Sequence, residues 1–351
     1  MLGLTYLVSA IQQTFRKETQ MRIRKLTGHE PKVKSSTRDY DYCVAVDWSE
    51  RTMATAVMAA DEALPLVWEG RSDVARLQTM VQDLPGRVIL TFEESTAAHW
   101  LYGKLLPYVE RLVVCNPGYN RLLCRGPKND TIDAIKLCLL LRQGSLKEVY
   151  HSTSKLYELR ELVSAYEDTV RAGVIAQNQF KACDRGRRTT GRSGIMITEQ
   201  LRARIEQYRH EKQQFEEAFT RWAKRIPVLR QLKRLPGIGL RGAVKILGHV
   251  IDGRRFPNRS HYWSYCGLVW HHKMSGGRRY GRRRPQYNHQ LKAVYKTAAL
   301  VAIKGSGPVA DYYRNLVAQG RAEHNARHAV ARYLARLSYG ILKQGVQHNN
   351  S

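Results

Sequence analysis

Four short apolar runs in the first half of the chain place the strongest limit on its fold. They are YCVAVDW from Tyr42, MATAVMAA from Met53, RVILTFEE from Arg87 and RLVVCNP from Arg111. Each run is rich in residues that favour strands and is bounded by turn-forming residues. Helix-like segments such as TAAHWLYGKLLPYV, from Thr96, lie between the runs. This alternation predicts an α/β domain, which we place at residues 39–150.

Two longer segments carry apolar residues three and four positions apart, which is the spacing of one helix face. The first extends from Leu156 to Val170 and the second from Leu201 to Ile226. The segment DRGRRTTGRSG between them is too rich in Gly and Arg to continue either helix. We therefore predict an antiparallel helical connector at residues 151–228. Coiled-coil packing within or between chains and an ordinary helical hairpin in one core fit this pattern equally well.

A mainly helical C-terminal domain is predicted at residues 229–351. In the sequence LKRLPGIGLRGAVKILGHV, the turn PGIG lies between two helix-like flanks. Its glycines, Gly237 and Gly239, would let backbone N–H groups approach a phosphate closely. This is the layout of a helix-hairpin-helix, which binds the DNA backbone without sequence preference, but such a turn is also a common structural connector. Residues 1–38 are expected to form a basic N-terminal extension.

The chain is strongly basic, with 58 Lys and Arg residues against 30 Asp and Glu residues and a net charge of +28. Residues 218–351 alone carry 26 basic residues and three acidic ones. So large an excess of positive charge favours binding to nucleic acid over the alternative that the basic residues only keep the protein soluble. No apolar run of about 18 residues is present, and LGLTYLVSAI at the N-terminus is a poor secretion signal. We therefore expect an intracellular protein without a membrane partner.

Carboxylates stand out at four places in this basic chain. Asp47 and the pair Glu93-Glu94 end two of the strand-like runs, and Asp130 and Asp133 share one face at the start of a helix. Such carboxylates repel each other unless cations lie among them, and hard oxygen ligands suit Mg²⁺. Together they predict a site for two metal ions and phosphodiester chemistry. Taken singly, each acid also fits a helix cap or a solvated turn.

The chain also resembles a known family, and the matching motifs occur in the family's order. The sequences VAVD at 44–47, ESTA at 94–97, NP at 116–117 and KNDTIDA at 128–134 are similar to the DEDD domain of the insertion-sequence transposases called bridge-RNA-guided recombinases. The similarity continues with LPGIG at 235–239, YCGL at 265–268, SG at 275–276 and ARHAVAR at 326–332. It spans roughly residues 40 to 345.

The resemblance implies an RNase H-like domain that binds metal through four acids, Asp47, Glu94, Asp130 and Asp133. It also implies that a serine of the C-terminal domain, by position Ser275, attacks a DNA phosphate and forms a covalent phosphoserine. The doubled Glu93-Glu94 leaves two candidates for the second acid. Glu94 is preferred because Thr96 then follows at the family's spacing.

Basic residues follow Ser275 and can neutralise the charge that develops on a phosphate. We predict nucleic-acid contacts for Lys128, Gly237, Gly239, Arg278, Arg279, Arg282, Arg283, Arg284 and Lys292. His271 and His272 are weaker candidates for accepting the serine proton. Without the resemblance, an incidental serine in a flexible basic loop is the favoured interpretation of Ser275.

The leading hypothesis is an RNA-guided DNA transposase or site-specific recombinase that uses two Mg²⁺ ions. Its expected partners are donor and target double-stranded DNA, a noncoding bridge RNA and further copies of the chain, as a dimer or tetramer. Its expected location is the cytoplasm, at the nucleoid. A structure-selective nuclease such as a junction resolvase would need the four acids but not Ser275. A noncatalytic nucleic-acid-binding protein would need neither.

Overall fold

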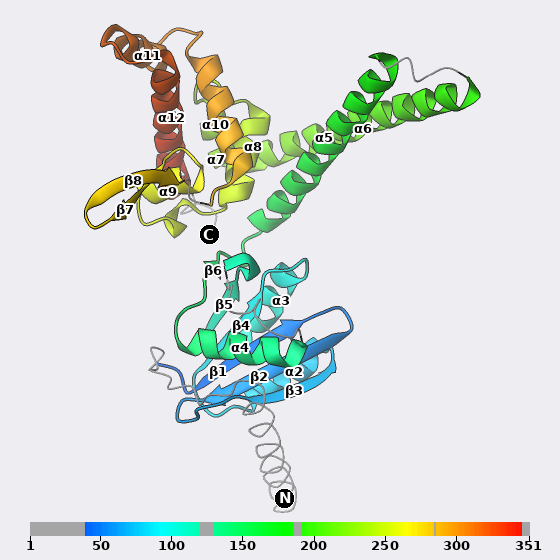
Figure 1. Ribbon diagram of the computed structural model, residues 1–351, viewed down its shortest axis with the longest axis vertical. Coiled ribbons are helices and arrows are strands. Elements are labelled where there is room, and N and C mark those ends of the chain that lie inside the picture. Colours follow the sequence, from blue (N-terminus) through cyan, green and yellow to red (C-terminus); the bar gives the residue numbers. More distant parts are fainter. Residues whose placement is uncertain (1–38, 120–128, 186–190, 284–285, 346–351) are drawn as a thin grey trace, which may run out of the picture. The chain divides into compact units, whose positions relative to one another are not determined.

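The computed structural model describes residues 39–119, 129–185, 191–283 and 286–345, and Figure 1 shows their elements. The chain divides into two compact units, Met1–Thr153 and Ser154–Ser351. The predicted N-terminal extension, Lys128 and Arg284 lie outside the described residues. In the described ranges, no helix combines the length and the apolar character needed to cross a membrane.

A six-stranded sheet forms the centre of the first unit. Its order is β3-β2-β1-β4-β5-β6. The strands are β1 (Tyr42–Trp48), β2 (Thr52–Ala59), β3 (Leu66–Arg71), β4 (Val88–Glu93), β5 (Arg111–Cys115) and β6 (Glu148–Val149). The first three strands pair antiparallel, whereas β4 and β5 run parallel to β1. This is the RNase H-like arrangement, and the predicted α/β class of this domain is confirmed.

Residues of β1 alternate between two cores, one on each face of the sheet. Cys43 and Ala45 belong to the core under α4 (Asp130–Arg142), while Val44 and Val46 belong to the core under α2 (Val74–Gln82) and α3 (Ala98–Leu105). Successive strand residues point to opposite faces, so Asp47 at the end of β1 is on the α4 side. The helix that begins with two aspartates therefore covers the face to which Asp47 belongs.

The predicted helical pair is present as α5 (Leu156–Arg185) and α6 (Arg192–Arg225), which cross in the view of Figure 1 and pack on each other. The ring of Tyr166 packs edge-on against Phe215 and Phe219, with centroids 6.0 and 5.1 Å apart. Both helices extend further into the Arg-rich segment than the apolar spacing predicted, because Arg is itself a good helix former. Gly191, with φ of 90°, immediately precedes α6.

The rest of the second unit is mainly helical, as predicted. Its elements are α7 (Pro227–Lys233), α8 (Leu240–Val250), α9 (Arg259–Tyr265), β7 (His271–Ser275), β8 (Arg278–Arg283), α10 (His289–Ala302), α11 (Pro308–Ala318) and α12 (Glu323–Gly345). Short 3₁₀ segments occur at Leu106–Tyr108, Pro117–Tyr119 and Gly253–Arg255.

The core of the second unit includes both the helical pair and the helices that follow it. The buried hydroxyls of Tyr262 and Tyr295 lie 2.6 Å apart between α9 and α10. Helix α8 packs on α5 so closely that a Cβ on Gly248 would lie 3.0 Å from Cγ2 of Val163. The predicted boundary between residues 228 and 229 therefore falls inside one compact unit.

Candidate active site

Three aspartates come together on the α4 side of the sheet. Asn129 is the N-cap of α4, and its side chain accepts a hydrogen bond of 2.9 Å from the amide of Thr131. Because Asn129 caps the helix, Asp130 and Asp133 are not needed for that role. Partial burial, and then the charges of Asp130 and Asp133, raise the pKa of Asp47 to about 6. The charges of Asp130 and Asp133 thus act on Asp47, while the role of the three acids as metal ligands stays a prediction.

The chemistry of the three aspartates fits a divalent cation. Oδ1 of Asp133 is buried and accepts no hydrogen bond, and it forms an ion pair with Nζ of Lys136, 3.6 Å away. The lysine balances one of the three negative charges, and a divalent cation would in addition relieve the repulsion that raises the pKa of Asp47. Among the described residues, no three Asp, Glu, His or Cys side chains are close enough to hold an ion together. The three aspartates therefore form an acidic region, but not a complete coordination site for a metal ion.

The two neighbouring glutamates have different surroundings. Oε2 of Glu94 lies 2.6 Å from Nε2 of the buried His151. Glu93 is the last residue of β4 and shares its strand parity with Ile89, which belongs to the core under α4. Alternation along the strand therefore assigns Glu93 to the face of Asp47. The choice of Glu94 as the second acid stays a prediction. Sequence reasoning missed His151, because it lies 57 positions from Glu94.

Ser275 lies at the tip of an exposed β-hairpin. It is the last residue of β7 and pairs with Arg278, the first residue of β8. Gly276 and Gly277 form the two-residue turn between them, with φ of 53° and 75°. Two-residue hairpin turns need this left-handed backbone, which glycine adopts readily. Sequence reasoning treated the segment as a loop, although a Gly-Gly pair between two short runs is a hairpin signal.

The hairpin is a basic ribbon that stands apart from the core. An isolated two-stranded sheet is only marginally stable in water, so a hairpin of this kind gains from a partner. Met274 and Tyr280 are 54% and 67% exposed. In the part of the chain that the structure describes, no carboxylate pairs with its arginines, Arg278, Arg279, Arg282 and Arg283.

The histidines of the hairpin are not placed as a base for the serine. Nε2 of His271 lies 3.2 Å from Oγ of Ser264, in α9. His271 and His272 pair with Arg283 and Arg282 at the far end of the hairpin from its tip. Within the described residues, the neighbour of Ser275 across the ladder is an arginine rather than a proton acceptor.

The PGIG turn of the predicted helix-hairpin-helix lies between α7 and α8. Gly237 has φ of 75°, and a Cβ on it would lie 2.2 Å from the carbonyl oxygen of Ala298 in α10. Gly237 is therefore required by the packing of the turn on α10. Gly239, the N-cap of α8, has open space where a Cβ would be. The phosphate contacts predicted for these glycines stay predictions.

Lys292 belongs to a group of basic side chains on α10 and α12. Its Nζ lies 3.2 Å from the hydroxyl of Tyr287. Burial lowers the pKa of His328 in α12, and the charges of Arg332, Lys296 and Lys292 lower it further. Positive charges from two helices thus converge on one place that attracts anions. The sequence prediction included Lys292 but missed Lys296 and Arg332.

Two family models match the chain in the regions that carry these groups. The first, described as Transposase, represents the DEDD class of IS110 elements and matches residues 44–183. That range contains nearly all of the sheet, the three aspartates and most of α5. The second, described as the Transposase IS116/IS110/IS902 family, matches residues 229–314. It contains the PGIG turn, the hairpin with Ser275 and Lys292.

A relative in Streptomyces coelicolor is similar to part of the chain. It is described as the insertion element IS110 uncharacterized 43.6 kDa protein, and it is 31% identical over 120 residues. The alignment covers 34% of this chain and 30% of the relative. The similarity therefore concerns about a third of each protein.

Proposed function

Because the chain carries both transposase domains of the IS110 family, we propose that it is a DNA transposase that cleaves and rejoins DNA when an insertion sequence moves. One observation carries this proposal. The acidic region on the RNase H-like sheet and the exposed serine on a basic hairpin each lie inside one of the two matched regions. A nuclease that used metal alone would have no use for the second group.

The acids of the first unit would hold the metal. Asp47, Asp130 and Asp133 supply carboxylate oxygens, and the fourth ligand is Glu94 by its spacing to Thr96, or Glu93 by its face of the sheet. These donors suit Mg²⁺, and we propose two ions. The ions would polarise the scissile phosphate and stabilise the charge that develops on it.

Ser275 is the proposed nucleophile. Its Oγ attacks the phosphorus and loses its proton, the bond from phosphorus to the 3′ oxygen breaks, and the 3′ oxygen leaves as a hydroxyl. The phosphodiester becomes a phosphoserine ester, so rejoining by the reverse step needs no external energy source. The arginines of β8 neutralise the phosphate charge in both directions. Exposure of the hairpin tip allows the serine to reach a backbone phosphate.

The choice of DNA is proposed to depend on a noncoding bridge RNA. The net charge of +28 is large enough for the chain to bind the phosphates of RNA and DNA together. Base pairing by a guide would remove the need for side chains that read the target sequence. Exchange between two duplexes requires four strand cleavages, which favours a dimer or tetramer acting at the nucleoid, in the cytoplasm.

The test is a search for a covalent protein–DNA adduct. The full chain is incubated with Mg²⁺, labelled DNA and RNA transcribed from the noncoding DNA that flanks the gene, and the products are separated under denaturing conditions. Wild type should give an adduct, and Ser275→Ala should lose both the adduct and the cleavage. Ser306→Ala is a matched control, because Ser306 is also exposed and lies between two glycines.

Three other outcomes of the adduct experiment would contradict the proposal. Cleavage that survives Ser275→Ala, with no adduct from wild type, would indicate a resolvase-like nuclease. Binding of DNA with no cleavage of any substrate would indicate a noncatalytic protein. Loss of cleavage in both serine variants would remove the case for Ser275 as the nucleophile.

A further inference from the structure

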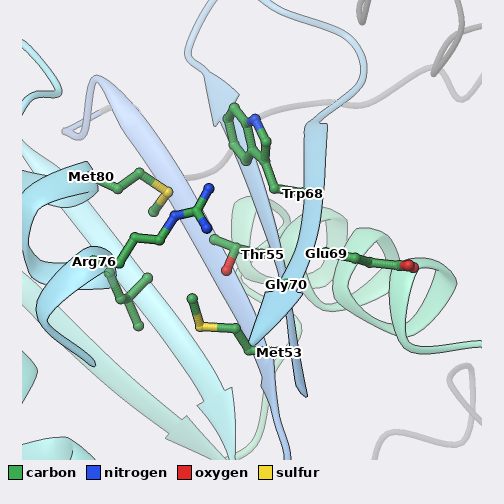
Figure 2. A pocket seen from close by; sticks show the side chains of 8 residues that line it. Met53, Thr55, Trp68, Glu69, Gly70, Arg76 and Met80 are labelled. Atoms are coloured by element: carbon green, nitrogen blue, oxygen red, sulfur yellow. The ribbon is translucent and has the colours of Figure 1, made fainter. Parts of the chain in front are cut away.

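A pocket opens in the first unit on the face of the sheet opposite the aspartates. Figure 2 shows it between the β2–β3 ladder and α2. Its volume is about 110 Å³. Its walls are formed mainly by Met53, Thr55, Trp68, Gly70, Arg76 and Met80. Glu69 also borders the pocket, but its side chain points away from it in Figure 2.

The pocket follows from the strand register and from one glycine. Thr55 pairs with Trp68 and Met53 pairs with Gly70, so these four residues share one face. Gly70 contributes no side chain and leaves the floor open. A Cβ on Gly70 would lie 3.7 Å from Nη1 of Arg76, so the guanidinium reaches over the floor. Any larger side chain at position 70 would therefore fill the cavity.

The walls suit a flat aromatic ring. Trp68 supplies an indole that is 36% exposed, and Arg76 supplies a planar guanidinium. Aromatic rings stack on both groups, and the thioethers of Met53 and Met80 also pack well against rings. Within the described residues, no carboxylate pairs with Arg76. The positive charge disfavours a cationic ligand and favours one that belongs to a polyanion.

The pocket continues into a row of further tryptophans on the same face of the sheet, formed by the partly buried Trp48 and the exposed Trp100. Met53 pairs with Trp48 in the β1–β2 ladder, and Trp48 directly follows Asp47. The ring of Trp48 packs against Trp100 of α3, with centroids 5.9 Å apart, and Trp100 is 48% exposed. Proteins that bind single-stranded nucleic acid stack successive bases on such rows.

We propose that this pocket receives one unpaired nucleobase of a single-stranded segment, stacked between Trp68 and Arg76. Neighbouring bases of the same strand stack on Trp48 and Trp100. The proposal shares with the proposed function the premise of a nucleic-acid partner, but it concerns binding only. Failure of DNA cleavage would leave it standing, and its own failure would leave the serine mechanism standing.

Binding of short oligonucleotides to the full chain provides the first test. Fluorescence anisotropy is measured without Mg²⁺, with labelled oligouridylate and oligothymidylate as probes. Trp68→Ala should weaken binding roughly fivefold to a hundredfold, the range for stacking one base on an aromatic ring. Trp68→Phe keeps a ring and should retain most of the affinity. Gly70→Val fills the floor without removing a ring or a charge, and it should weaken binding as Trp68→Ala does.

Arg76→Ala and Arg71→Ala form a matched pair. Both remove one positive charge, but Arg71 lies on the opposite face of β3 by strand alternation. Arg76→Ala should weaken binding several-fold more than Arg71→Ala. Equal effects of the two variants, or an unchanged affinity in folded Trp68→Ala, would overturn the proposal and point to a protein ligand for the pocket. Thermal melting of each variant shows whether it is folded.

Photo-crosslinking locates the base directly. An oligonucleotide with one 4-thiouridine is irradiated on the full chain, and the linked peptide is identified by mass spectrometry. A crosslink to the peptide that contains Trp68 or to the one that contains Met80 is expected. Crosslinks confined to residues after Ser154 would contradict the proposal. If only RNA probes bind at Trp68, the ligand is a guide RNA, and if DNA probes bind equally, it is any unpaired strand.

Discussion

Nε2 of His151 lies 2.6 Å from Oε2 of Glu94, and this contact gives Glu94 a different partner from the aspartates. The side chain of His151 is 2% exposed, and the rings of His99 and Tyr102 lie 6.3 and 5.4 Å from its ring. Both of these rings belong to α3, which covers the face of the sheet opposite α4 and the three aspartates. Glu93 is instead assigned by strand alternation to the face of Asp47.

This arrangement leads to a test of the second metal ligand. We expect Glu93→Gln to abolish Mg²⁺-dependent cleavage without unfolding the protein, because it removes a charge from the face of Asp47. Glu94→Gln should lower stability and reduce cleavage by at most roughly a hundredfold, as substitutions near a metal site do. Cleavage rates and melting temperatures of both variants decide between them. Loss of cleavage only in Glu94→Gln would support the ligand chosen from the spacing to Thr96.

A second prediction concerns the stability of the metal-free protein. The pKa of Asp47 is about 6 in the fold against 3.8 ordinarily, so the folded state binds more protons than the unfolded state between these values. Stability therefore falls as pH rises through this window, and the ionised carboxylate destabilises the fold above it. Asp47→Asn should raise the melting temperature at about pH 7.5 and lose this gain near pH 4.

Asp83→Asn is the control for this comparison, because Asp83 is exposed at the end of α2. It should change the melting temperature far less than Asp47→Asn does, because an exposed charge at a helix end contributes only about 0.3–1 kcal/mol. Mg²⁺ should stabilise wild type above pH 6 but not Asp47→Asn, since the ion needs the carboxylate that the proton occupies at lower pH. A gain in Asp83→Asn equal to that in Asp47→Asn would contradict the prediction.

The features that the sequence predicted correctly depend on residues that are close together in the chain. The strands appear as apolar runs, and the shared face of Asp130 and Asp133 follows from helical spacing. The contact of Glu94 with His151 carries no local signal, because it depends on how distant segments pack. The conformation of Gly237 was interpreted through phosphate binding, whereas its tight approach to Ala298 depends on α10, about 60 residues away.

A third prediction concerns a buried ionic group that joins α5 to α8. Oε1 of Glu167 lies 3.2 Å from Nζ of Lys245 and 3.0 Å from Nε2 of His249. Glu167→Gln would leave Lys245 largely buried without its counter-charge, which typically costs roughly 3–5 kcal/mol of unfolding free energy. Urea denaturation measures this loss. Glu206→Gln is the control, since the exposed pair of Glu206 and Arg209 should contribute less than about 1 kcal/mol. Similar small losses in both variants would show that the buried group is dispensable.

The two glycines of the PGIG turn provide a fourth prediction, which separates folding from nucleic-acid binding. Gly237→Ala forces a side chain into the left-handed region at φ 75° and toward the carbonyl of Ala298, 2.2 Å away. Strain of this kind costs roughly 1–3 kcal/mol before the clash is relieved, so the melting temperature should fall by several degrees. Gly239 has φ of −80° and open space where a Cβ would lie, so the melting temperature of Gly239→Ala should match that of wild type.

The binding of double-stranded DNA by Gly239→Ala then tests the predicted phosphate contact alone. If the amide of Gly239 approaches a phosphate, the added methyl group keeps the backbone farther away and weakens binding several-fold in a protein that melts normally. If binding is unchanged, PGIG serves as a connector whose glycine is required by α10 rather than by DNA. Gly237→Ala cannot make this distinction, because its loss of packing would lower binding whether or not a phosphate is contacted.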